Sequence, residues 1–131
     1  MAKKKWTKPK QMYNGHVYVL KIWFGDDIVY KVGTTNRTPK ARLFEIADEL
    51  YKIKGYIPKM KILKESTTKD NYKVEAEVLR VTEKYKYVIP GLSEFTGDSE
   101  IRKMDEDELM KEYNLAILKD YPADIKFEVS L

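Results

Sequence analysis

The sequence predicts an α+β fold, in which helices flank a small, mainly antiparallel β-sheet within a single domain. Two observations support this prediction. Short segments of alternating apolar and polar residues, typical of strands, are interspersed with longer segments in which apolar residues recur at helical spacing. No internal repeat and no linker long enough to separate two domains interrupts the 131 residues. A single hydrophobic core of modest size is therefore expected.

The first half of the chain predicts a hairpin followed by a helix. Residues 16–24 and 28–33 alternate in the manner of strands, and the Gly-Asp-Asp at 25–27 is typical of a tight turn. Pro39 suits the first position of a helix, and Thr38 suits its N-cap. The apolar residues at helical spacing in this predicted helix are Leu43, Ile46, Ala47 and Leu50.

The middle of the chain predicts a third strand and a second helix. Gly55 and Pro58 end the preceding helix region, and the stretch "IPKMKILKES", residues 57–66, alternates imperfectly in the manner of a strand. Either Thr68 or Asp70 suits the N-cap of a helix over about residues 71–87, which "IPG" then terminates. Further on, Asp105 suits the cap of a third helix.

The C-terminal part predicts that third helix over residues 106–120 and a final strand at 124–131. Acidic residues crowd the first turn of the helix, where they complement its dipole. In "DIKFEVSL", the apolar residues alternate as they do in a half-buried strand.

The chain divides into a basic arm, residues 1–12, and a single domain, residues 13–131. The arm's five lysines exceed the whole chain's net charge of +4, so the remainder is weakly acidic. Such an arm is either a solvated, disordered end or a segment that follows the phosphates of a nucleic acid. The second interpretation predicts phosphate contacts from Lys3, Lys4, Lys5, Lys8 and Lys10.

Composition excludes several classes of site. The chain has no cysteine and one histidine, which excludes disulfides and thiolate metal sites and argues against a zinc site. Any catalytic metal is therefore expected to have oxygen ligands. The sequence offers neither the apolar core of a signal peptide nor an apolar run of membrane-spanning length, which favours the cytoplasm and no membrane partner.

Glu75 is the most informative anomaly in the second predicted helix. On a wheel that turns about 100° per residue, the apolar arc runs from Val81 through Val74 and Val78 to Leu79, and Glu75 lies inside it. A carboxylate on an apolar face needs a partner. The sequence leaves three alternatives open: a bound cation, a buried ion pair, or a boundary glutamate whose carboxylate reaches water.

Several short motifs resemble, in their order, the signature of the GIY-YIG nuclease superfamily. "HVY" at 16–18 stands where GIY belongs, "KVG" at 31–33 where YIG belongs, and "KARL" at 40–43 supplies an arginine, Arg42. The chain is more similar still to the phage T5 open-reading-frame branch of that superfamily, in which a threonine follows the lysine-bearing motif. Further matches to that branch are "EAEVL" from Glu75, "KYKYVIP" at 84–90 and "EFTGDSE" at 94–100.

The resemblance covers about residues 17–104 and leaves the arm and residues 105–131 unexplained. It implies a metal-dependent DNA endonuclease encoded by a phage or mobile element, with one Mg²⁺ or Mn²⁺ ion held by Glu75. Arg42 would hold the scissile phosphate, and Tyr18 would orient or deprotonate the attacking water. Lys31 would act as a phosphate clamp or proton carrier. A dimer is one way in which such an enzyme cuts both strands.

Other polar residues next to the hairpin are candidate phosphate contacts. Hydroxyl, amide and cationic side chains following the second strand can donate hydrogen bonds to phosphate oxygens. These are Thr34, Thr35, Asn36, Arg37 and Lys40.

Two departures from the nuclease pattern remove groups that could transfer protons. Lys31 replaces the second tyrosine, and Ile46 stands where many of these nucleases have histidine or tyrosine. The resemblance therefore supports the fold better than it supports catalysis.

The site residues also have structural interpretations. Tyr18 would serve as a core aromatic of a strand, and Arg42 as an ion-pair partner of Glu45 or Glu49 on its own helix. Arg37 and Lys40 would be solvated charges. For Glu94 and Glu100 the alternatives are a second acidic group in the site and a place in a charged loop. For His16 they are a base beside Tyr18 and a polar residue at the start of a strand.

Three functions follow from these alternatives. The leading one is the endonuclease. The first alternative is a catalytically degenerate DNA-binding module of the same fold, which would need no divalent ion. The second is a protein-interaction or inhibitor domain that uses the acidic helix, residues 105–121, as its contact surface.

Overall fold

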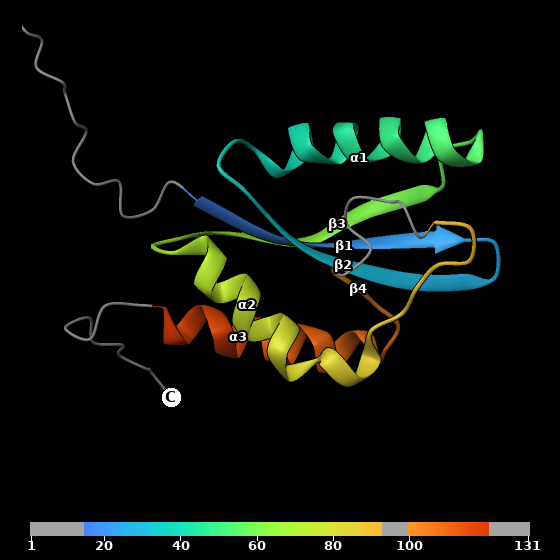
Figure 1. Ribbon diagram of the computed structural model, residues 1–131. Coiled ribbons are helices and arrows are strands. Elements are labelled where there is room, and N and C mark those ends of the chain that lie inside the picture. The colour runs from blue at the N-terminus through green and yellow to red at the C-terminus, as the bar shows by residue number, and fades with distance from the viewer. Residues whose placement is uncertain (1–14, 93–99, 121–131) are drawn as a thin grey trace, which may run out of the picture.

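The computed structural model describes residues 15–92 and 100–120 (Figure 1). These residues form one small α+β domain, as the sequence predicted, with four antiparallel strands and three helices within the described ranges. In chain order the elements are β1 (Gly15–Phe24), β2 (Asp27–Thr35), α1 (Pro39–Lys54), β3 (Lys59–Thr68), α2 (Asn71–Val81), the 3₁₀ turn η1 (Glu83–Tyr85), β4 (Ile101–Arg102) and α3 (Glu106–Lys119). The predicted arm, residues 1–12, and the predicted last strand, 124–131, lie outside the described residues.

The sheet has the strand order β3-β1-β2-β4, so the β1–β2 hairpin forms its centre. The hairpin turns through two residues, since Phe24 pairs with Asp27. Gly25 has a φ of 56° there. Hairpin turns of this length require a positive φ, which glycine adopts without steric cost. The predicted hairpin is thereby confirmed.

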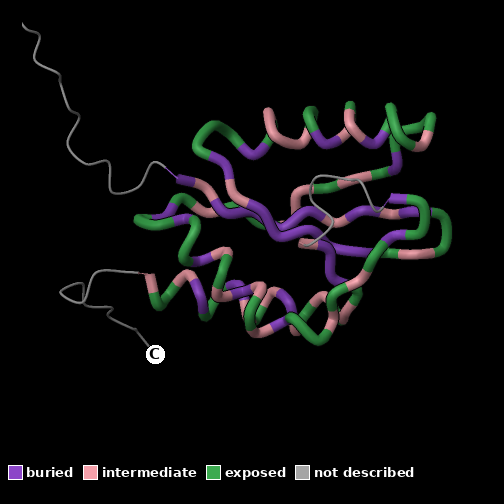
Figure 2. Tube along the Cα trace, viewed as in Figure 1, coloured by how far each residue is buried: buried purple, intermediate pink, exposed green. Residues whose placement is uncertain are grey.

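Alternation along the central strands sends side chains to two faces, and each face has its own apolar cluster. Figure 1 shows α1 on one side of the sheet and α2 and α3 on the other, and Figure 2 shows the buried stretches of the central strands between them. The α1-side cluster includes Tyr18, Leu20, Ile22, Val29, Ile46 and Leu50. The opposite cluster includes Val17, Val19, Val32, Val74, Val78, Leu109 and Tyr113.

Side-chain caps begin the three helices where the sequence predicted them. Thr38 Oγ1 accepts a hydrogen bond from the Ala41 amide at 3.2 Å. Asp105 caps α3 in the same way, and Gly55 ends α1 in the left-handed conformation. For α2 the structure selects between the two predicted caps: Asp70 accepts from the Lys73 amide at 3.2 Å.

The second helix is shorter than predicted. It ends at Val81 rather than near residue 87, and the chain continues as the 3₁₀ turn. Thr82 donates its hydroxyl to the Val78 carbonyl at 2.7 Å, and the buried Arg102 donates to the Leu79 carbonyl at 3.3 Å. The Val78 carbonyl also accepts from the Thr82 amide at 3.1 Å, and Arg102 supplies a donor for the Leu79 carbonyl at the helix end. The α2 helix can therefore stop without the proline that the sequence offered.

The short strand β4 was not predicted. Its two residues pair with Tyr30 and Lys31 on the free edge of β2, and too few residues are involved to produce any alternation. Two backbone bonds tie the segment to the chain after α2, from Tyr87 N to Ile101 O at 3.1 Å and from Lys103 N to Tyr85 O at 3.0 Å.

Candidate functional site

Tyr18 and Lys31 meet on the α1 side of the hairpin, as the register set by its two-residue turn requires. Tyr18 pairs with Gly33, and Leu20 pairs with Lys31, so all four side-chain positions share one face. Lys31 Nζ lies 3.5 Å from the Tyr18 hydroxyl and 5.5 Å from the centre of its ring. Both side chains are almost fully buried, with 1% of Tyr18 and 2% of Lys31 exposed. Tyr18 therefore belongs to the core and to the candidate site at once.

Gly33 makes this arrangement possible. A Cβ at this position would collide with the Tyr18 hydroxyl and would lie 2.9 Å from Lys31 Nζ. The Tyr18 ring thus crosses its neighbouring strand where a side chain is missing. The need for glycine arises from packing within the protein.

Glu100 supplies the counter-charge to Lys31. Lys31 Nζ donates to Glu100 Oε1 at 2.5 Å, and the Glu100 side chain is 26% exposed. A buried ammonium is costly unless it is paired. Ile101 of β4 pairs with Lys31 of β2, and this pairing brings the preceding residue, Glu100, to the lysine. The sequence alone left open whether Glu100 belonged to the site or to a charged loop.

Glu75 is partly buried beside this pair, on the inward side of α2 that the helical wheel predicted. Burial raises the pKa of its carboxyl group to about 7; the charge of Glu100 and a hydrogen bond with it act in the same direction, while Lys31 opposes them. A hydrogen bond between two carboxyl groups requires a proton on one of them. Among the described residues no group donates to Glu75 Oε2, which is fully buried.

Arg42 is turned toward its own helix. Its Nη1 atom lies 3.2 Å from Glu45 Oε1, and Arg37 Nη2 lies 2.6 Å from Glu45 Oε2. Hydrogen bonding from Arg37, and then from Arg42, lowers the pKa of Glu45 despite partial desolvation. Within the part of the chain that the structure describes, no hydrogen bond or ion pair joins Arg42 to Tyr18, Lys31 or Glu75. Its Glu45 contact matches one of the two partners that the sequence suggested.

Comparison with known proteins places these residues in a family. The model of the T5orf172 domain matches residues 15–116, from the first residue of β1 into α3. The chain belongs to the T5orf172 domain family. No curated protein and no solved structure matches it.

The T5orf172 match contains Tyr18, Lys31, Arg42, Glu75 and Glu100, whereas the lysines of the arm precede it. The charged cluster therefore lies inside the family domain. In the described part of this domain, none of the helices has the length and apolarity needed to cross a membrane.

Two of the predicted phosphate contacts, Thr35 and Asn36, accept hydrogen bonds from Asn71 and so join the β2–α1 loop to the start of α2. Asn71 Nδ2 donates to the Thr35 carbonyl at 3.4 Å and to Asn36 Oδ1 at 3.1 Å. The Thr35 hydroxyl accepts from the Arg37 amide at 3.1 Å. Thr34 is partly exposed; Arg37 and Lys40 are exposed. Lys3, Lys4, Lys5, Lys8 and Lys10 lie outside the described residues, as does Glu94.

Sequence reasoning missed Asn71, which is 5% exposed. A Cβ at Gly15 would collide with its side chain, so the two residues are matched in size. The only sequence signal was an Asp-Asn pair at a helix start, which indicates a cap rather than a clamp between a loop and a helix.

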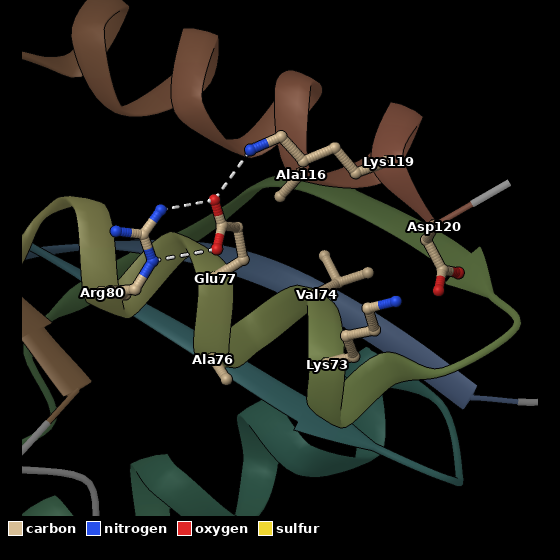
Figure 3. Close-up of a pocket in the computed structure, with 8 residues that line it drawn as sticks. All are labelled: Lys73, Val74, Ala76, Glu77, Arg80, Ala116, Lys119 and Asp120. Atoms are coloured by element: carbon tan, nitrogen blue, oxygen red, sulfur yellow. Dashed lines mark hydrogen bonds and ion pairs between the residues drawn. The ribbon is translucent and has the colours of Figure 1, made fainter.

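A groove of about 260 Å³ lies between α2 and α3, and its lining includes none of Tyr18, Lys31, Glu75 and Glu100 (Figure 3). Glu77 bridges it, accepting from Arg80 Nη2 at 2.9 Å and from Lys119 Nζ at 2.9 Å. These bonds, Arg80's first, lower the pKa of Glu77 to about 2. The groove therefore has a charged rim, in which Glu77 is paired with two of the cations, over apolar residues such as Val74.

The donor set beside Lys31 fits a divalent cation. Hard cations such as Mg²⁺ and Mn²⁺ take carboxylate oxygens and complete their coordination with water. Glu75 Oε2 is buried without a donor among the described residues, which is the environment that a cation would satisfy. No group of three or more metal-ligating side chains occurs there. A cation at this position would therefore rely on water or phosphate oxygens for most of its ligands.

Proposed function

We propose that this protein is a metal-dependent DNA endonuclease of the GIY-YIG type. The observation that carries the proposal is the buried Oε2 of Glu75, which has no hydrogen-bond partner among the described residues and lies near the charge of Lys31. An orphaned carboxylate oxygen in the interior costs free energy that a cation would offset. Placing it beside a buried ammonium and a phenol gathers charge-stabilising and proton-donating groups in one place.

Hydrolysis adds the hydroxide of a water molecule to phosphorus, breaks one P–O bond and needs a proton for the leaving oxygen. A bound Mg²⁺ or Mn²⁺ would stabilise charge on the phosphoryl oxygens and acidify a water. The Tyr18 hydroxyl accepts from Lys31, so its own O–H remains able to donate to a water or a phosphate oxygen. Lys31 would place positive charge near the phosphate.

Arg42 would bind the scissile phosphate with its planar guanidinium. It is 22% exposed and linked to Glu45 by a single 3.2 Å contact. An exposed pair of this kind contributes little stability, so a phosphate is able to replace the carboxylate.

One observation favours the alternative of a DNA-binding module without catalysis. Ile46 is fully buried in the α1-side cluster, so the position that carries histidine or tyrosine in many GIY-YIG nucleases contributes packing only. Lys31, at the second tyrosine position, is itself held by Glu100. The alternative predicts salt-sensitive DNA binding that does not need a divalent ion.

A plasmid-nicking assay with Mg²⁺, Mn²⁺ or EDTA separates the two functions. Wild type, Glu75→Gln and Glu77→Gln would be compared, because Glu77 lies on the same helix but outside the cluster and undergoes the same change in charge. The endonuclease proposal expects metal-dependent nicking that Glu75→Gln abolishes and Glu77→Gln retains. DNA binding without nicking under any of these conditions would support the binding module.

A further inference from the structure

We propose that Glu100 is a second protein ligand of the divalent cation, and that Lys31 and the cation compete for its carboxylate. This inference rests on the cation site of the proposed function. It adds to that site a ligand from a second part of the chain. It also gives the buried Lys31 a role before any DNA binds, as the competitor of the cation.

The first argument is the position of Glu100. Its Oε1 accepts from Lys31 Nζ at 2.5 Å, and the charges of both Glu100 and Lys31 act on Glu75. The two carboxylates thus approach one another from α2 and from the residue before β4. Carboxylates that face each other in a partly buried site are stabilised by a shared proton or by a cation.

The second argument is that the backbone that directly follows Glu100 is anchored. Ile101, the next residue, pairs with Lys31 and accepts from the Tyr87 amide at 3.1 Å. Ligands held on paired backbone keep their geometry better than ligands on free loops. Glu75 is anchored equally well, because its neighbours Val74 and Val78 are buried in the opposite cluster.

The third argument is charge. With both glutamates ionised, the two carboxylates share one directly paired ammonium, that of the 2% exposed Lys31, while the charge of Arg102 also acts on Glu100. The ammonium neutralises one carboxylate and leaves Glu75 Oε2 without a donor among the described residues. A divalent cation would neutralise both carboxylates. It would also release Lys31 from Glu100 toward a phosphate group.

Binding of Mn²⁺ to the DNA-free protein, measured by calorimetry, tests the assignment. Glu75→Gln and Glu100→Gln should each weaken binding by more than about tenfold, since each removes an anionic ligand. Glu77→Gln should bind as wild type does. Wild-type affinity in Glu100→Gln would overturn the inference, even where Glu75→Gln is weakened.

Lys31→Met tests the competition. Removing the ammonium while keeping an apolar stem of similar length should tighten Mn²⁺ binding by several-fold, on the order of the effect of one nearby charge. Unchanged or weaker binding would show that Lys31 does not compete with the cation.

A measurement on the wild-type protein covers the case in which Glu100→Gln fails to fold. Addition of Mg²⁺ should shift the carboxylate ¹³C signals of both Glu75 and Glu100 and leave that of Glu77 unchanged. A shift confined to Glu75 would overturn the assignment of Glu100. The nicking assay reports separately: cation binding through both glutamates without nicking would contradict only the proposed function, and nicking with a Glu75-only site would contradict only this inference.

Discussion

Lys31 and Glu100 are 69 residues apart in the chain, and their side chains meet at 2.5 Å between Nζ and Oε1. The two partners differ in exposure, with 2% of Lys31 and 26% of Glu100 accessible to water. Only the carboxylate can be hydrated when the pair is broken. The loss in the free energy of unfolding on removing one partner therefore depends on which partner is removed.

Glu100→Gln should lower the free energy of unfolding by about 2 kcal/mol, because it leaves a buried ammonium without its counter-charge. Lys31→Met should cost less, since Glu100 can still reach water. The double variant Lys31→Met/Glu100→Gln should be more stable than Glu100→Gln alone. Urea unfolding in EDTA measures all three; equal losses in the two single variants would contradict the asymmetry.

Gly33→Ala should destabilise the protein by about 1–3 kcal/mol, the usual cost of overpacking a well-filled interior. The added methyl group would occupy the space of the Tyr18 hydroxyl. In a Tyr18→Ala background the same substitution should cost much less, because the colliding ring is gone. Urea unfolding of the four proteins in this cycle gives the interaction energy; an additive result would mean that the ring moves aside freely.

The hairpin, its register and the shared face of Tyr18 and Lys31 were predictable because they depend on local alternation and a turn that glycine favours. The three helix starts were predictable for a similar reason, since each cap lies within three residues of the amide it satisfies. Glu75 was singled out correctly as an inward-facing carboxylate by the geometry of its own helix.

Glu100 and the end of α2 depend on contacts that no local pattern encodes. Strand β4 has only two residues and gains its partner from the edge of β2. Arg102, which helps to end α2, comes from beyond residues 93–99. For Arg42 the sequence offered two ion-pair partners and a phosphate, and only the folded structure favours Glu45 among the protein groups.

Arg102→Met should cost about 3 kcal/mol, because the 1% exposed guanidinium serves several buried acceptors at once. It donates to Thr82 Oγ1 at 3.0 Å, to the Ile101 carbonyl at 3.0 Å and to the Leu79 carbonyl at 3.3 Å. Methionine provides none of these donors, so the Leu79 carbonyl loses its bond from Arg102, while the Ile101 carbonyl keeps the Tyr87 amide and Thr82 keeps its bond to Val78. Thermal unfolding checks the loss, and hydrogen exchange should show faster opening at the end of α2. Unchanged exchange there would contradict the capping role.

Glu77 should make stability depend on pH in the acid range. Arg80 and Lys119 lower its pKa to about 2, below the ordinary value of 4.5, so the folded protein binds this proton less tightly than the unfolded chain does. Its contribution is complete above about pH 4.5 and is lost as the pH falls toward 2. The stability difference between wild type and Glu77→Gln should shrink over that range in urea titrations. A stability difference between the two proteins that stays constant from pH 6 to pH 2 would contradict this role of the ionised Glu77.

Arg42→Lys should reduce metal-dependent nicking by about 100-fold, because lysine keeps the charge but lacks the planar fork that stabilises a phosphoryl group. Arg37→Lys is the matched control. It makes the same chemical change at an exposed arginine that also pairs with Glu45. It should retain nicking and weaken DNA binding only slightly. Nicking rates under single-turnover conditions, with DNA affinity measured at the same salt concentration, separate the chemical step from binding. Equal losses in the two variants would mean that Arg42 acts as one more surface cation and that the scissile phosphate is held elsewhere.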